Sequence, residues 1–143
     1  MKCLMMMLVA LVATACATTD ASHEQYEALT RKMFDAFNRH DWKVMSECYS
    51  DSASFLDPSF GKKYVRQRRS DIAEKYAGMQ QMFPDLHDSV EAVHVSGHTA
   101  VVQFVATGSS GDSVLFRLPI ISVLTFEGDH IVKDATYYDL EIQ

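Results

Sequence analysis

The sequence predicts an α+β fold in which helices cover one face of an antiparallel sheet. Apolar residues recur at helical spacing in much of the first half of the chain, whereas short segments of strand character separated by turns fill residues 87–139. No Pro/Gly-rich linker and no internal repeat divides the chain. We therefore expect one domain over residues 22–143.

Three segments are predicted to be helices. The pattern Ser22-x-x-Gln25 is a capping box ahead of an amphipathic segment, which should end at a turn over residues 38–40. Asp41 is placed to cap a second, short helix. Ser70 is placed to cap a third, which should end before Pro84.

The strands are predicted from a change of period. Residues 53–57 have the character of a strand, and Pro58 stops it. Four later strands, separated by turns rich in Gly, Ser and Asp, should form an antiparallel meander over residues 87–95, 99–107, 114–126 and 130–139.

The strand over residues 114–126 is apolar at both parities. Leu115, Ile121 and Val123 share one face, whereas Phe116 and Leu124 belong to the other. Antiparallel sheets usually leave one face to water, so a strand of this kind indicates that both faces are covered. We expect helices on one face and a second copy of the chain, in a homodimer, on the other.

The first sixteen residues have the pattern of an export signal. One lysine, an apolar run and small residues precede Cys16, and the run is too short to span a bilayer comfortably. The end of this segment, Ala-Thr-Ala-Cys, resembles the bacterial lipobox, in which cleavage leaves a lipid-bearing cysteine. The alternative is an ordinary signal peptide cleaved after Ala15. We expect a signal over residues 1–15, lipid on Cys16 and a tether over residues 16–21.

Ala17 follows the predicted lipid-bearing cysteine, as in lipoproteins sent on to the outer membrane. This resemblance places the domain in the periplasm of a bacterial envelope. Of the other cysteines, Cys3 leaves with the signal, and Cys48 is expected to be a small buried hydrophobic residue.

Composition and spacing exclude several classes of function. The formal net charge is −6 at pH 7, which argues against a nucleic-acid partner. The histidines and cysteines have no metal-ligand spacing, and phosphate-binding loops are absent from the sequence. We predict no metal and no cofactor.

The chain resembles the nuclear transport factor 2-like superfamily, and within it the SnoaL-like polyketide cyclase and ketosteroid isomerase branch. The resemblance rests on four segments and covers nearly all of the mature chain. They are Phe-Asn-Arg-His-Asp-Trp at residues 37–42, Tyr-Ser-Asp-Ser-Ala at 49–53, Phe-Leu-Asp-Pro at 55–58, and the closing pattern from Phe126 to Asp139. It implies a cone in which a curved sheet wraps three N-terminal helices and leaves an apolar pocket at the open end.

The resemblance places Asp57 where the isomerases of this branch hold an aspartate general base. Met33 and Ile121 stand where those enzymes have two donors that bind an enolate oxygen. Neither side chain can donate, and loss of one such donor typically costs about 2.7–4 kcal/mol. Steroid-type isomerisation is therefore not expected. Asp57 has two interpretations, a pocket acid or base and a cap of the turn at Pro58.

Asp134, Thr136 and Tyr138 share one parity in the last strand, and the resemblance turns that parity toward the pocket. They could orient a polar group of a ligand, with Met33, Trp42 and Ile121 on the apolar wall. The alternatives are a solvated strand end for Asp134 and a half-buried cross-strand partner for Tyr138.

Two basic features also have alternative interpretations. Arg117 lies amid apolar residues. It either binds a ligand carboxylate or has a structural role, in which it pairs with an acidic residue or extends its charged end to the rim of the fold. The basic cluster Lys62, Lys63, Arg66, Arg68 and Arg69 is either a solvated loop or a contact for anionic lipid headgroups.

Taken together, the sequence predicts a lipid-anchored SnoaL-like domain that binds a small apolar molecule, with cofactor-free acid/base chemistry centred on Asp57. The alternative is a non-catalytic envelope module that dimerises or holds a protein partner through its sheet face. Whether the chain is an enzyme stays open at this point.

Overall fold

The structure, a computed structural model, describes residues 13–111 and 113–139, with the backbone alone for residues 13–20 and Val114. The elements in chain order are α1 (Ala13–Asn38), α2 (Trp42–Glu47), β1 (Tyr49–Leu56), the 3-10 turn η1 (Pro58–Phe60), β2 (Val65–Arg68), α3 (Arg69–Met82), β3 (His87–Ser96), β4 (Thr99–Ser110), β5 (Ser113–Glu127) and β6 (His130–Tyr137). No helix in this part of the chain has an apolar stretch long enough to cross a membrane.

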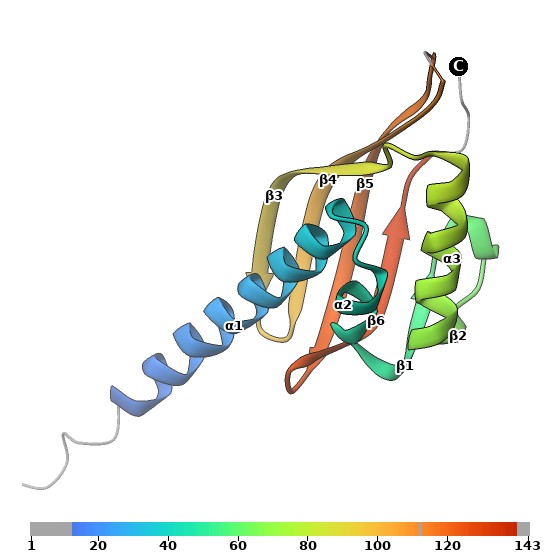
Figure 1. The fold of residues 1–143 in the computed structure, drawn as a ribbon. Helices are drawn as coiled ribbons and strands as arrows, with labels where there is room; N and C mark the ends of the chain where they lie inside the picture. The colour runs from blue at the N-terminus through green and yellow to red at the C-terminus, as the bar shows by residue number, and fades with distance from the viewer. Residues whose placement is uncertain (1–12, 112, 140–143) are drawn as a thin grey trace, which may run out of the picture.

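The six strands form one sheet in the order β2-β1-β6-β5-β4-β3 (Figure 1). Neighbouring strands are antiparallel, except that β1 and β6 are parallel. Because parallel strands end at the same edge of a sheet, the residues that follow β1 and β6 are brought together. This pairing builds the site described below.

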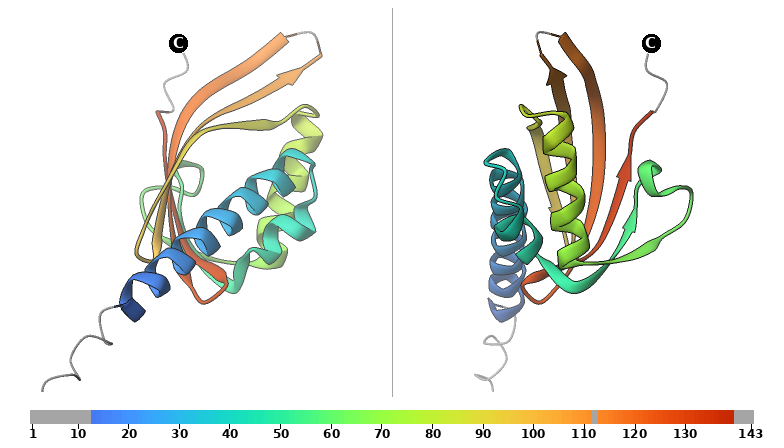
Figure 2. Two further views of the ribbon diagram at one scale, coloured as in Figure 1. Left: turned by 90° about the vertical axis from the view of Figure 1, so that its left-hand side faces the viewer. Right: turned by 45° about the vertical axis from the view of Figure 1, so that its right-hand side comes forward.

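All three helices lie on one face of the sheet, which curves around them (Figure 2). α1 contacts β3 and β4, whereas α3 contacts β1 and β2, and α2 lies between α1 and α3. The core lies between these helices and the sheet. From α1 it takes Tyr26, Met33, Phe34 and Phe37, which recur on one side of the helix, and Tyr26 stacks on Phe126 of β5 at a centroid distance of 4.5 Å.

The α+β fold class and the strands of the meander are confirmed, but the three helices do not all precede the sheet. β1, η1 and β2 separate α2 from α3. β2 was not predicted, because its residues, Val-Arg-Gln-Arg, contain one apolar side chain among charged and polar ones and so lack the pattern of a strand. The sheet therefore has six strands instead of the predicted five.

Helix starts were predicted with mixed success. Asp41 caps α2 as expected, because its carboxylate accepts from the Val44 N–H at 3.1 Å. The start at Ser22 is wrong, since α1 runs back to Ala13 through a segment without Gly or Pro. The cap at Ser70 is also wrong: α3 begins at Arg69, and the Asp71 carboxylate accepts from the Arg68 N–H at 3.1 Å.

The predicted tether over residues 16–21 falls within the helical backbone of α1. Residues 1–12 lie outside the described part of the chain, as does the side chain of Cys16, so the signal and its lipid stay predictions. Cys48 is buried as expected, and its Sγ lies 3.4 Å from the Val44 carbonyl oxygen.

Candidate functional site

The candidate site lies at the edge where β1 and β6 both end. In the parallel register Leu56 is opposite Ala135, so Asp57, the next residue after β1, comes beside the end of β6. The Tyr138 hydroxyl donates to Asp57 Oδ1 at 3.0 Å. The structure therefore joins two predicted site residues that are separated by 81 positions in the chain.

Asp57 also caps the turn that follows it. Its Oδ1 accepts from the Ser59 N–H at 2.7 Å, and Pro58 occupies the first position of η1. Lys75 of α3 places its Nζ 3.4 Å from Asp57 Oδ2 and donates to Ser59 Oγ at 3.1 Å. The capping interpretation of Asp57 is confirmed, and we call Asp57, Ser59, Lys75 and Tyr138 the Asp57 site.

The Asp57 site holds its carboxylate ionised. Burial alone would raise the pKa of Asp57, but hydrogen bonds from Ser59, the charge of Lys75 and the bond from Tyr138 lower it below its usual value. The side chain of Asp57 is 14% exposed, so the site reaches solvent. For Tyr138, burial and the charge of Asp57 raise the pKa to about 12, which keeps its hydroxyl a donor.

A second carboxyl group faces the helices from β6. Asp134 is 7% exposed, and its two oxygens accept from the Tyr49 hydroxyl at 2.8 Å and from Thr136 Oγ1 at 3.0 Å. Thr136 Oγ1 lies 2.7 Å from Ser122 Oγ of β5. We call Tyr49, Ser122, Asp134 and Thr136 the Asp134 network. Its burial excludes the solvated strand end that the sequence also allowed.

The pKa of Asp134 is raised to about 6. Burial is the main cause, the charge of Asp57 adds to it, and the hydrogen bonds from Tyr49 and Thr136 oppose it. The two carboxyl groups thus have pKa values shifted in opposite directions. This arrangement can keep one group charged while the other exchanges a proton near neutral pH.

Tyr76 of α3 lies within electrostatic reach of both carboxyl groups. Burial is the largest cause of a pKa well above the usual value for tyrosine, followed by the charges of Asp134 and Asp57. Its ring packs against Phe37 and Trp42. Among the described residues, no group forms a hydrogen bond with the Tyr76 hydroxyl.

The other predicted site residues lie apart from these carboxyl groups. Met33 is buried in the core, and Trp42 is half-buried, with Nε1 donating to Gln80 Oε1 at 2.9 Å. Ile121 is a correction: it is 42% exposed on the face of β5 turned away from the helices, where it pairs with exposed Tyr137. Its neighbour Ile120 packs against the core instead.

The basic features are also placed by the structure. Arg117 is exposed, so it does not clamp a ligand inside the fold. Two members of the basic cluster have structural contacts with β1. Arg66 Nη2 donates to the Ser52 carbonyl at 2.9 Å, and Arg69 Nη1 lies 2.9 Å from Asp51 Oδ1.

Four residues of the two groups gave no functional signal in the sequence: Tyr49, Ser59, Lys75 and Ser122. Lys75 and Ser59 belong to a predicted helix and a turn, and Tyr49 was singled out only as part of the segment at residues 49–53. The only available signal was the resemblance of the segment around Tyr49. In residues 13–111 and 113–139, no three His, Cys, Asp or Glu side chains lie together as metal ligands would.

Solved structures with the same fold include several bacterial proteins. A protein of ketosteroid isomerase-like fold from Catenulispora acidiphila, solved with trimethylamine, is 17% identical with a TM-score of 0.69, over 78% of this chain and 85% of that chain. A candidate ketosteroid isomerase from Kribbella flavida is 22% identical with a TM-score of 0.68, over 88% and 84%. IdmH, a candidate polyketide cyclase from Streptomyces antibioticus, is 18% identical with a TM-score of 0.68, over 79% and 91%.

These identities establish the fold alone. No curated protein matches the chain. The model of the SnoaL-like domain matches residues 30–133, which include β1 to β5, the Asp57 carboxylate and the first half of β6. The chain therefore belongs to the SnoaL-like domain family.

Proposed function

We propose that this SnoaL-like domain binds a small, mostly apolar molecule beside Asp57 and Asp134 and moves a proton on it without a cofactor. The observation that carries the proposal is the pair of inward carboxyl groups with oppositely shifted pKa values. Such pairs supply both roles of acid/base catalysis within one site.

Partly buried apolar side chains on η1, on α3 with its C-terminal cap, and on β5 support an apolar ligand. Phe60, Tyr76, Met79, Phe83 and Ile120 are only partly buried, and all five pack against the core. Lys75 Nζ lies 3.9 Å from the centroid of the Phe60 ring, so the charged site and this surface adjoin. Small-molecule sites are typically lined by apolar side chains with a few convergent polar groups.

The geometry favours different roles for the two aspartates. In our proposal Asp134, with a pKa of about 6, exchanges the proton, because a group that titrates near the working pH is an efficient acid or base. Asp57 stays ionised and holds Tyr138 in place as a hydrogen-bond donor. This changes the expectation from the sequence, which centred the chemistry on Asp57.

A thermal-shift screen of the purified protein against apolar ketones, lactones and polycyclic phenols would test the proposal. A ligand at this site should lose affinity in the Asp134→Asn and Tyr138→Phe variants and keep it in Asp129→Asn, an exposed control. A ligand with equal affinity for all three variants would contradict the site. Binding without turnover in any assay would remove the chemistry and leave the binding role.

We further propose that the domain is anchored in a bacterial envelope through lipid on Cys16. The support is the sequence of residues 1–17 alone. When the gene is expressed in a bacterium fed an alkyne fatty acid, the wild type should carry the label and sediment with membranes. The Cys16→Ser variant should lose both properties. Unlabelled wild-type protein in the soluble fraction would contradict the anchor.

A second candidate function, a dimerising or partner-holding module, is favoured by one observation. Leu115, Ile121 and Tyr137 are 49%, 42% and 53% exposed, respectively, and Ile121 pairs with Tyr137 in the register. We propose that this face of the sheet pairs two copies of the chain. Ile121→Glu should convert a dimer to a monomer in sedimentation equilibrium. A wild-type monomer at micromolar concentration would contradict the proposal.

A further inference from the structure

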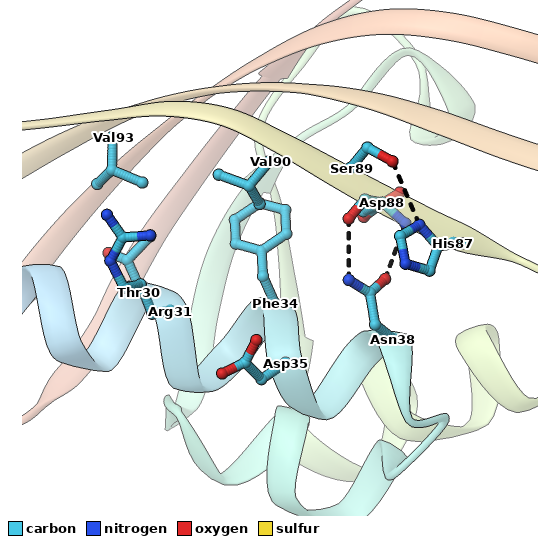
Figure 3. A pocket seen from close by; sticks show the side chains of 10 residues that line it. All are labelled: Thr30, Arg31, Phe34, Asp35, Asn38, His87, Asp88, Ser89, Val90 and Val93. Carbon is cyan, nitrogen blue, oxygen red and sulfur yellow. Dashed lines mark hydrogen bonds between the residues drawn. The ribbon is translucent and has the colours of Figure 1, made fainter.

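A groove of about 380 Å³ lies between α1 and β3, away from the Asp57 site (Figure 3). Three strands, β6, β5 and β4, separate β3 from β1 in the sheet. One part of the lining of the groove is apolar and is formed by Phe34 of α1 with Val90 and Val93 of β3. The charged residues of the lining include Arg31, Asp35 and Asp88.

Asp88 is a largely buried residue whose carboxyl group has no partner among the described residues. The residue is 7% exposed. Its backbone is fixed by Asn38, whose amide donates to the Asp88 carbonyl at 2.9 Å and accepts from the Asp88 N–H at 2.8 Å. Within the described part of the chain, no donor and no cation contacts its side chain. No fully buried side-chain polar atom among the described residues lacks a hydrogen-bond partner, so the Asp88 carboxyl oxygens are accessible from the groove that the residue lines.

The charges around the groove favour a cation. Arg31 contributes a cationic side chain to the lining, but its Nη2 lies 2.7 Å from Glu27 Oε1, so its charge is offset within α1. Asp35 adds a second carboxylate to the lining and is exposed. The groove therefore presents acidic groups beside an apolar wall.

We propose that the groove binds a small primary amine with an apolar body, whose ammonium group donates to the Asp88 carboxylate while the body packs on Phe34, Val90 and Val93. A charged hydrogen bond in a partly desolvated site would supply affinity, and the apolar wall would select for the body. This site is distinct from the proposed acid/base site and does not depend on it.

Titration of Asp88 gives the proposal a specific signature. Burial alone raises the pKa of Asp88 to about 8, so the free protein holds this group protonated at neutral pH. Binding of an ammonium ion requires the carboxylate and therefore releases one proton. The titratable or charged groups that face Asp88 are Arg31 and Asp35 on α1, His87 on β3 and Tyr76 on α3.

Calorimetric titration of the full chain with 2-phenylethylamine and with 2-phenylethanol tests the proposal. The two probes differ only in the head group. We expect the amine to bind at least tenfold more tightly than the alcohol at pH 8.5. Between pH 8 and pH 6 the affinity for the amine should fall about tenfold per pH unit, and heats in buffers of different ionisation enthalpy should reveal one released proton.

Variants distinguish binding of the amine in this groove from nonspecific attraction of a cation to an acidic protein. Asp88→Asn should lower the affinity for the amine tenfold or more and abolish proton release, whereas Asp129→Asn should change neither. His87→Gln should leave the proton release intact. Equal binding of amine and alcohol, or an unchanged affinity in a folded Asp88→Asn variant, would overturn the proposal.

Discussion

Asp134 and Asp88 are equally buried, each 7% exposed, yet they occupy opposite electrostatic environments. Asp134 accepts hydrogen bonds from Tyr49 and Thr136, and its pKa is about 6. Asp88 has no such donor among the described residues, and its pKa is about 8. The comparison indicates that the donors around a buried carboxyl group, as much as its burial, decide whether it is charged at neutral pH.

The largest effect is expected from Asp88→Asn. Between pH 4 and pH 8 the folded protein holds a proton on Asp88 that the unfolded chain has released, so the free energy of unfolding falls as pH rises. Replacement by the neutral amide should remove this dependence and stabilise the protein at pH 8 by up to about 5 kcal/mol. Urea unfolding of both proteins at pH 5 and pH 8 measures the difference.

The control for this prediction is the same measurement at pH 3, which lies below the pKa of Asp88 in both the folded and the unfolded chain, so that the wild-type side chain is largely neutral in both states. There the variant should differ from the wild type by less than at pH 8. A stability difference between the wild type and the variant that stays constant from pH 5 to pH 8 would show that Asp88 is ionised in the folded protein throughout this range.

The next largest effect concerns the donors of Asp134. Tyr49→Phe removes a buried hydroxyl that donates to the carboxylate at 2.8 Å, so the pKa of Asp134 should rise from about 6 toward that of Asp88. Above pH 6 the variant should lose about 1.5–3 kcal/mol, the range for hydrogen bonds to charged groups. Carboxyl-carbon NMR titration reports the pKa, and urea unfolding reports the stability.

Tyr138→Phe is the matched control, because its hydroxyl donates to Asp57 instead. It should leave the titration of Asp134 nearly unchanged. If both tyrosine variants shifted the pKa of Asp134 equally, the two carboxyl groups would titrate as one coupled system. The pKa of Asp134 would then not be set by its own hydrogen-bond donors.

Periodicity predicted most of the elements but not how they pair. Capping by Asp41 and the strands after Pro84 follow from local patterns. The parallel pairing of β1 with β6 joins segments about 80 residues apart and leaves no local mark in the sequence, yet it brings Asp57 to Tyr138. For that reason the resemblance, and not spacing, located these two residues.

Side-chain environments were harder still to predict. Asp134 was placed with Tyr138 by strand parity, but the sequence could not reveal Tyr49 as its donor, because that contact spans 85 positions. Asp88 follows a loop at the start of β3, where an aspartate is ordinarily a solvated turn residue. Its burial depends on α1 packing across that end of the strand, through Asn38.

A smaller effect is expected at Asp57, the carboxyl group with the most donors. Its lowered pKa contributes stability above the unfolded pKa of the group, and this contribution is lost as pH falls through the folded pKa. Lys75→Met removes one of the groups that lower the pKa of Asp57 but leaves the hydrogen bonds from Ser59 and Tyr138. Because both partners of this ion pair are partly exposed, the loss at pH 7 should be about 0.5–1 kcal/mol. Acid unfolding followed by fluorescence should begin at higher pH in the variant.

The smallest effect tests whether Asp88 truly lacks a protein partner. Arg31 lines the same groove, and its pairing with Glu27 is an exposed contact between successive helical turns. Arg31→Gln should therefore cost about 0.3–0.5 kcal/mol and leave the pKa of Asp88 within about 0.3 of its starting value. Carboxyl-carbon NMR titration decides the point. A clear rise in the pKa of Asp88 would mean that Arg31 already stabilises its carboxylate. Asp88 would then differ from Asp134 in having one weak partner, Arg31, in place of the two hydrogen-bond donors Tyr49 and Thr136.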